Sequence, residues 1–139
     1  MILLDINILL DVLQRREPHY NASARAIDAV VRKKIEGVLS AHAITTIDYV
    51  VTRYSGAQKS RDVIDWLLSR FTIAAIGRPE LLRAYSLAWE DFEDAVTMAA
   101  AESTACEAIV TRDAQGFARS PIMVCTPEEF LSFGGPQTQ

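Results

Sequence analysis

The amino-acid sequence predicts an α/β fold, a three-layer α/β/α sandwich with a mainly parallel central sheet. Short apolar runs of strand length recur along the chain, and segments with helical periodicity separate most of them. Strands that alternate with helices are joined by right-handed crossovers, which make the strands parallel and cover both faces of the sheet. At 139 residues the chain has the length of one domain. We expect this domain over residues 1–133 and a disordered tail over 134–139.

The first half of the chain is expected to form two strands and four helices. Pro18 separates the first two helices, and Gly56 separates the last two. In order, we expect a strand at 2–4, helices at 6–14 and 19–34, a strand at 37–40, and helices at 41–54 and 59–71. Helical spacing places the following side chains toward the core: Ala24, Ile27, Val30, Val31, Ala43, Ile47, Val50, Val51, Tyr54, Val63, Trp66, Leu67 and Phe71.

The second half repeats the alternation. Pro79 stands near the first turn of a helix, as proline often does, and an alanine-rich segment predicts a further helix. In order, we expect a strand at 72–76, helices at 79–88 and 91–105, a strand at 108–111, a turn that carries Asp113, a strand at 122–125 and a helix at 127–133.

Composition excludes several classes of protein. The net charge of −4 and the pI near 5.1 argue against nonspecific coating of nucleic acid by the whole surface. No apolar run is long enough to cross a bilayer, and Asp5 interrupts the N-terminal run too early for a signal peptide. We interpret Cys106 and Cys125 as buried thiols, which favours a reducing cytoplasm.

Four aspartates fall where a parallel sheet binds ligands. Asp5 ends the first strand, Asp113 follows the strand at 108–111, and Asp91 and Asp94 begin the alanine-rich helix. Ligands of such sheets bind beyond the carboxyl ends of the strands. If the alanine-rich helix begins at this same edge, three or four carboxylates converge there.

Convergent carboxylates need compensation. Two of them about 5 Å apart repel by ~3 kcal/mol at an effective dielectric constant near 20. Either the group takes up protons, or a hard cation such as Mg²⁺ or Mn²⁺ binds the oxygens. The alternative is that each aspartate only caps a helix or turn, since aspartate is a favoured N-cap.

Five segments in this order and spacing resemble the PIN-domain family: "ILLDINILLDVL", "GVLSAHAITTIDYVVTR", "DFEDAVTMAAA", "AIVTRDAQGF" and "IMVCTPEEFL". The resemblance runs from about Ile2 to Leu131. It implies a metal-dependent ribonuclease that cleaves RNA phosphodiesters. Many bacterial and archaeal relatives are VapC-type toxins of type II toxin–antitoxin pairs, so it also implies a cognate antitoxin, and homodimers are common in the family.

The resemblance also assigns roles. Asp5, Asp94 and Asp113 match the family's catalytic, metal-binding acids, with Asp91 as a further metal ligand. Supporting positions are Asn7, Thr111 and Asp11.

Two positions depart from the family pattern. Ile6 replaces the usual Thr or Ser, and the second acid of the family falls near Thr46. Asp48 lies two residues on, which turns it about 200° around a helix. The gap leaves open whether the metal site is complete.

The sequence therefore predicts a divalent-metal-dependent endoribonuclease, the toxin of a toxin–antitoxin pair. The alternative is a PIN-like domain with weak or no activity that binds RNA or a protein partner. Asn7 and Ile8 argue against a haloacid-dehalogenase-type phosphatase. Around Tyr49, Tyr54, Val63 and Trp66 the helices could offer an apolar groove to an antitoxin helix, unless these side chains belong to the core.

Overall fold

A computed structural model describes residues 1–32 and 35–133 of the chain. The predicted tail at 134–139 and the last two residues of the helix predicted at 19–34 lie outside these ranges. The elements in order are β1 (Ile2–Leu4), α1 (Ile6–Leu13), α2 (Tyr20–Arg32), β2 (Gly37–Ser40), α3 (Ala41–Ser55), α4 (Ala57–Arg70), β3 (Thr72–Ala74), α5 (Arg78–Leu87), α6 (Phe92–Ser103), β4 (Ala108–Val110), the 3₁₀ helix η1 (Ala114–Phe117), β5 (Met123–Cys125) and α7 (Pro127–Phe133).

The strands form one parallel sheet in the order β3-β2-β1-β4-β5. β1 is central: its Leu3 lies opposite Val38 of β2 and Ile109 of β4. Each pair along the sheet is parallel, so the ends of β1 and β4 carry Asp5 and Thr111 to the same edge. The predicted fold class is confirmed.

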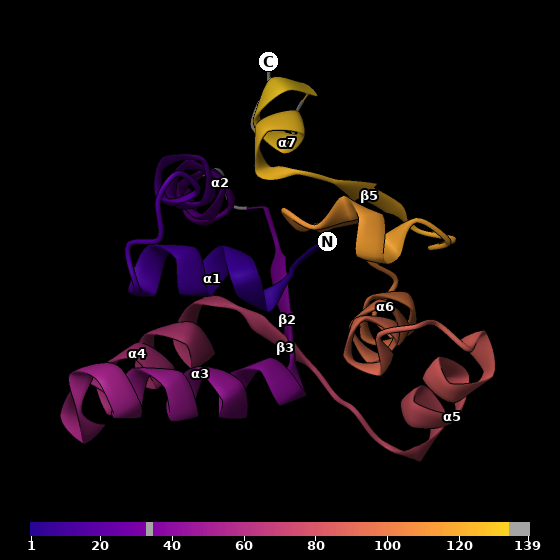
Figure 1. Ribbon diagram of the computed structural model, residues 1–139, viewed down its shortest axis with the longest axis horizontal. Coiled ribbons are helices and arrows are strands. Elements are labelled where there is room, and N and C mark those ends of the chain that lie inside the picture. Colours follow the sequence, from indigo (N-terminus) through magenta and orange to yellow (C-terminus); the bar gives the residue numbers. More distant parts are fainter. Residues whose placement is uncertain (33–34, 134–139) are drawn as a thin grey trace.

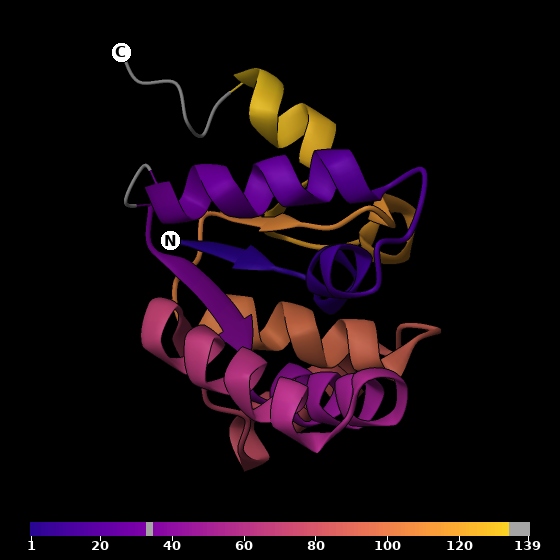
Figure 2. The ribbon, with the colours of Figure 1, turned by 90° about the vertical axis from the view of Figure 1, so that its left-hand side faces the viewer.

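Helices cover both faces of the sheet, as Figure 1 shows, with α1 to α4 on one side and α5 and α6 on the other. Figure 2 views the first of these sides. Alternate strand residues point to opposite faces. Leu4 and Val110 pack with α1 to α4 and α7, whereas Leu3 and Ile109 pack with α6. Within residues 1–32 and 35–133, no helix combines the length and the apolar character needed to cross a membrane.

Two predicted core positions are wrong. Tyr54 is 68% exposed and Trp66 is 38% exposed. Ile47 and Leu67 in the same helices are buried as expected. Periodicity gives the direction in which a side chain points but not how far along the helix a neighbour covers it, and the last turn of α3 is exposed.

Helix α2 buries a face slightly different from the one predicted. Its buried residues are Ser23, Ala26, Ala29 and Val30, and Ala24 is only half-buried. The burial of Ser23 is compensated by a hydrogen bond that its hydroxyl donates to Asp11 of α1, at 2.9 Å. The packed face of α2 thus includes a polar residue that has its partner on the neighbouring helix.

Candidate active site

Asp5 lies at the end of β1, where the chain turns into α1, and it is buried. Its backbone N–H donates to the carbonyl of Val110, which keeps it in the sheet. The carboxylate accepts hydrogen bonds from the Ile6 N–H and the Thr111 hydroxyl, each at 2.8 Å. Burial raises the pKa of Asp5, and these two donors oppose the rise. Thr111 therefore stabilises the charged form of Asp5.

Asp94 lies in the first turn of α6, and Asp91 caps that helix. The Asp91 carboxylate accepts a hydrogen bond from the Asp94 N–H at 3.1 Å. Burial, followed by the charges of Asp91, Asp5, Asp113 and Glu93, raises the pKa of Asp94 to about 7. The charges of aspartates from three elements therefore act on one carboxyl group.

Asp113 lies between β4 and η1 and caps the 3₁₀ helix. Its N–H donates to the Thr111 hydroxyl at 3.0 Å, and its carboxylate accepts from the Gly116 N–H at 3.3 Å. A Cβ added to Gly116 would lie 2.7 Å from Asp94 Oδ2 and 3.1 Å from Asp113 Oδ2. The two carboxylates thus approach the same point beside Gly116, where an added Cβ would displace the Asp94 carboxylate.

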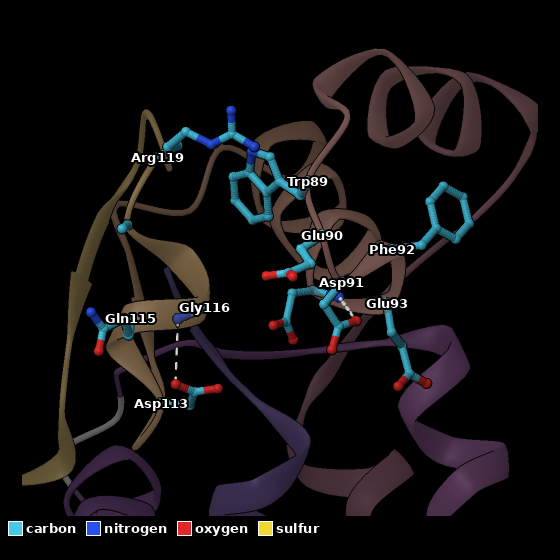
Figure 3. A pocket seen from close by; sticks show the side chains of 11 residues that line it. Trp89, Glu90, Asp91, Phe92, Glu93, Asp113, Gln115, Gly116 and Arg119 are labelled. Atoms are coloured by element: carbon cyan, nitrogen blue, oxygen red, sulfur yellow. Dashed lines mark hydrogen bonds between the residues drawn. The ribbon is translucent and has the colours of Figure 1, made fainter.

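A cleft of about 730 Å³ opens over these groups. Figure 3 shows Asp91 and Asp113 beside the cleft and Trp89 and Arg119 at its other end. The lining residues are Trp89, Glu90, Asp91, Phe92, Glu93, Asp94, Asp113, Gln115, Gly116, Ala118 and Arg119. Asp5 lies outside this set, and it lines a small neighbouring cavity together with His42, Glu93 and Asp94.

Glu93 is the acid that sequence reasoning missed. It lines both the cleft and the small cavity, and its charge raises the pKa of Asp5 and of Asp94. The available signal was its position between Asp91 and Asp94, in the first turn of the same helix. Side chains in one helical turn point in different directions, so sequence spacing alone does not show that Glu93 lines the cleft.

The position of the family's second acid holds no carboxylate. Thr46 donates its hydroxyl to the carbonyl of His42, and Asp48 accepts from Ser60 on α4, at 2.7 Å. Asp48 therefore joins α3 to α4. From α3, His42 and Ala43 line the small cavity, and the Nδ1 of His42 is buried without a partner among the described residues.

Asp11 has a structural environment. It is fully buried and accepts hydrogen bonds from Ser23 and from the Arg112 guanidinium, whose Nε lies 2.8 Å from Asp11 Oδ2. Asp11 is therefore not a solvated surface position. Asp11 does not line the cleft, and its bond to Arg112 holds the segment that precedes Asp113 against α1.

The donor types suit a hard divalent cation. The carboxylates of Asp5, Asp94 and Asp113 could supply oxygen ligands. The buried Oδ1 of Asn7 has no hydrogen-bond donor among the described residues, but Asn7 lines neither the cleft nor the small cavity. Across residues 1–32 and 35–133, no three His, Cys, Asp or Glu side chains gather closely enough to hold one ion. Charge acts on a pKa over a longer range than ligation, and the space beside Gly116 brings Asp94 and Asp113 together. The pair Asp94 and Asp113 therefore fits a cation best.

Comparisons with known proteins agree with this architecture. A family model described as PIN domain matches residues 1–115. Ribonuclease VapC1 of Aquifex aeolicus is 25% identical over 134 residues, which cover 93% of this chain and 92% of that protein. A chain in a toxin-antitoxin complex from Klebsiella pneumoniae superposes with a TM-score of 0.71 at 25% identity, covering 91% of this chain and 98% of that one. VapC20 of Mycobacterium tuberculosis, a sarcin-ricin loop cleaving toxin, superposes with a TM-score of 0.69 over 85% of this chain and 94% of that one; at 12% identity this shows the fold alone.

Proposed function

This chain belongs to the PIN-domain family, and we propose that it is a divalent-metal-dependent endoribonuclease. The observation that carries the proposal is the approach of Asp94 and Asp113 to one point, beside a cleft open to solvent. Its similarity to a relative named a ribonuclease supports the same reaction class.

Each residue of the candidate site has a proposed role. Asp94 and Asp113, with Asp5 and Asp91 beside them, would hold Mg²⁺ or Mn²⁺. Bound there, the metal would neutralise the acids and stabilise the negative charge of a phosphodiester during hydrolysis. Thr111 holds Asp5 and Asp113 together by donating to the first and accepting from the second. Asp91 fixes the first turn of α6 through its cap.

Replacement of Asp5 or Asp94 by Asn tests the assignment. We expect each variant to cut RNA more slowly with Mn²⁺, on the order of 100-fold, because a ligand charge is lost while the side chain keeps its size. Asp65→Asn, on the exposed surface of α4, is the matched control and should cut at the wild-type rate. Undiminished cleavage by both site variants would remove these residues from the reaction.

The competing function is a PIN-like domain that binds RNA or protein without cutting. The missing acid near Thr46 favours it, because fewer carboxylates hold a cation less tightly. Isothermal titration of the protein with Mn²⁺ separates the two. A nuclease shows binding that Asp94→Asn abolishes, whereas a scaffold shows none that depends on this carboxylate.

We also propose that the chain is the toxin of a toxin–antitoxin pair. The Klebsiella pneumoniae structure to which this chain is similar is a toxin-antitoxin complex. In this chain Val63 and Trp66 line an apolar groove of about 290 Å³ together with Leu9 and Leu13 of α1 and Ile27 of α2. The groove would accept the apolar face of an antitoxin helix.

The expected groove differs in part from the observed one. Tyr49 and Tyr54 are exposed and do not line it. We expect expression of the chain to arrest growth and co-expression of the adjoining reading frame to relieve the arrest. Trp66→Glu should abolish the relief, while Tyr49→Glu should preserve it. Relief that survives Trp66→Glu would place the antitoxin elsewhere.

A further inference from the structure

The two ends of the cleft differ in charge. Five of the lining residues are acidic, and Arg119 is the basic residue among those that line the cleft in the described part of the chain. Figure 3 shows Arg119 beside Trp89, on the opposite side of the cleft from Asp113. Arg119 is exposed and takes part in no ion pair within residues 1–32 and 35–133. Its charge is therefore available to a ligand in the cleft.

Contacts between two loops hold this basic end in place. Arg119 Nη2 donates to the carbonyl of Ala88, at 3.3 Å. Ala88 ends α5 with a left-handed backbone (φ 55°), and Trp89 follows it. The Trp89 ring meets the Phe117 ring edge-on, with centroids 5.9 Å apart and planes at 89°. Since a guanidinium has five N–H donors, the single bond to Ala88 leaves others for a ligand.

We propose that Arg119 binds a phosphate of the RNA strand next to the phosphate that is cleaved, with Trp89 forming the wall beside the nucleotide between them. The inference rests on the proposed function. The acidic end of the cleft accepts a phosphate only with a cation bound, whereas Arg119 attracts one by itself. The volume of about 730 Å³ lies within the range of pockets that hold a small ligand, roughly 300–1,000 Å³.

This arrangement separates two tasks. The carboxylates and their cation act on the scissile phosphate, whereas Arg119 fixes where the strand lies. Arg119 is thus a substrate-binding residue whose loss raises KM and leaves kcat close to the wild-type value. Its contact is to the backbone, so it adds affinity for every RNA sequence.

The test measures binding without cleavage. The probe is a fluorescein-labelled single-stranded RNA of mixed sequence, about 12 nucleotides long, titrated in Ca²⁺ at several KCl concentrations. We expect Arg119→Ala to weaken binding about tenfold and to lower the slope of log K against log salt by about 0.7, the value for one phosphate contact on a single strand. Arg119→Lys should keep the slope and lose part of the affinity. Arg61→Ala, an exposed arginine on α4, is the matched control and should bind as wild type does.

The outcomes distinguish this inference from the function on which it rests. Suppose that the wild type binds and cuts RNA, and that Arg119→Ala binds RNA with the same affinity and the same salt slope as the wild type. Arg119 then has no phosphate contact, and the nuclease proposal stands. If the wild type neither binds nor cuts RNA in any divalent ion, both proposals fall. A rise in KM with unchanged kcat in Arg119→Ala supports the inference through an independent readout.

Discussion

At the scale of single residues, the candidate site brings carboxylates that repel one another close together. Asp94 is half-buried and has Asp91, Asp5, Asp113 and Glu93 as charged neighbours, which together with burial raise its pKa to about 7. The pKa of Asp5 is also raised, chiefly by burial. Both groups therefore bind a proton more tightly in the folded protein than in the unfolded chain.

The metal-free protein should lose stability as the pH rises. Below the ordinary aspartate pKa of 3.8 both states are protonated; between there and about 7, the folded state retains a proton on Asp94 that the unfolded state has released. The free energy of unfolding therefore falls across this window. Urea unfolding in EDTA at a series of pH values measures it, and Asp94→Asn should flatten the dependence. Equal pH profiles for the two proteins would contradict the assignment.

Asp11 illustrates a different use of a buried carboxylate. Its oxygens are satisfied by Ser23 and Arg112, and the Arg112 side chain is 28% exposed. We expect Asp11→Ala to lower the free energy of unfolding by about 2–4 kcal/mol, because it leaves a guanidinium and a hydroxyl without their acceptor. Asp28→Ala, which breaks an exposed pair with Arg32, should cost below ~1 kcal/mol. Chemical denaturation compares the two, and equal losses would show that burial of Asp11 contributes nothing.

At the scale of elements, the site depends on the close approach of η1 to the first turn of α6. Gly116 lies at the contact, and its missing side chain leaves the space that the carboxylates of Asp94 and Asp113 share. The turn is capped by Asp113 and the helix by Asp91. An aspartate that caps a helix or turn could therefore also bind a cation, because a capping carboxylate has further lone pairs.

Gly116→Ala should weaken cation binding and leave the stability of the fold nearly unchanged. The new Cβ would meet the ends of two flexible side chains, so the free energy of unfolding should change by less than ~1 kcal/mol. The Asp94 carboxylate must move, and Mn²⁺ affinity should fall at least tenfold. Gly77→Ala, whose Cβ would meet its neighbours at ordinary distances of 3.5 Å or more, is the control for titration calorimetry. Unchanged Mn²⁺ affinity in Gly116→Ala would exclude this point as the metal position.

At the scale of the whole molecule, ligand binding and folding are linked. A cation that binds the folded carboxylates and ignores the unfolded chain raises stability by RT ln(1 + [L]/Kd), about 2.7 kcal/mol at a concentration 100 times Kd. We expect Mn²⁺ to raise the melting temperature and EDTA to reverse the rise. Asp94→Asn should remove the response, and a full response in that variant would place the stabilising ion at another site.

The sequence by itself determined the layers, the parallel sheet and the edge at which the candidate site lies. Continuous apolar runs mark strands that are buried on both faces, and the period of 3.6 gives the buried face of each helix. Parallel strands bring their carboxyl ends to one edge. Asp5, Thr111 and Asp113 follow from this rule. The strand predicted at 72–76 is longer than β3 (Thr72–Ala74), because apolar character alone does not say where strand pairing stops.

Only the tertiary structure decided which side chains meet. Asp11 binds Arg112 and does not line the cleft, although the two residues are far apart in the sequence. Glu93 entered the cleft, and Gly116 provided room between Asp94 and Asp113. Arg119 was placed at the basic end by a bond to a loop on another element. Local periodicity describes each element separately, whereas these contacts depend on how loops set neighbouring elements against each other, which no short stretch of sequence encodes.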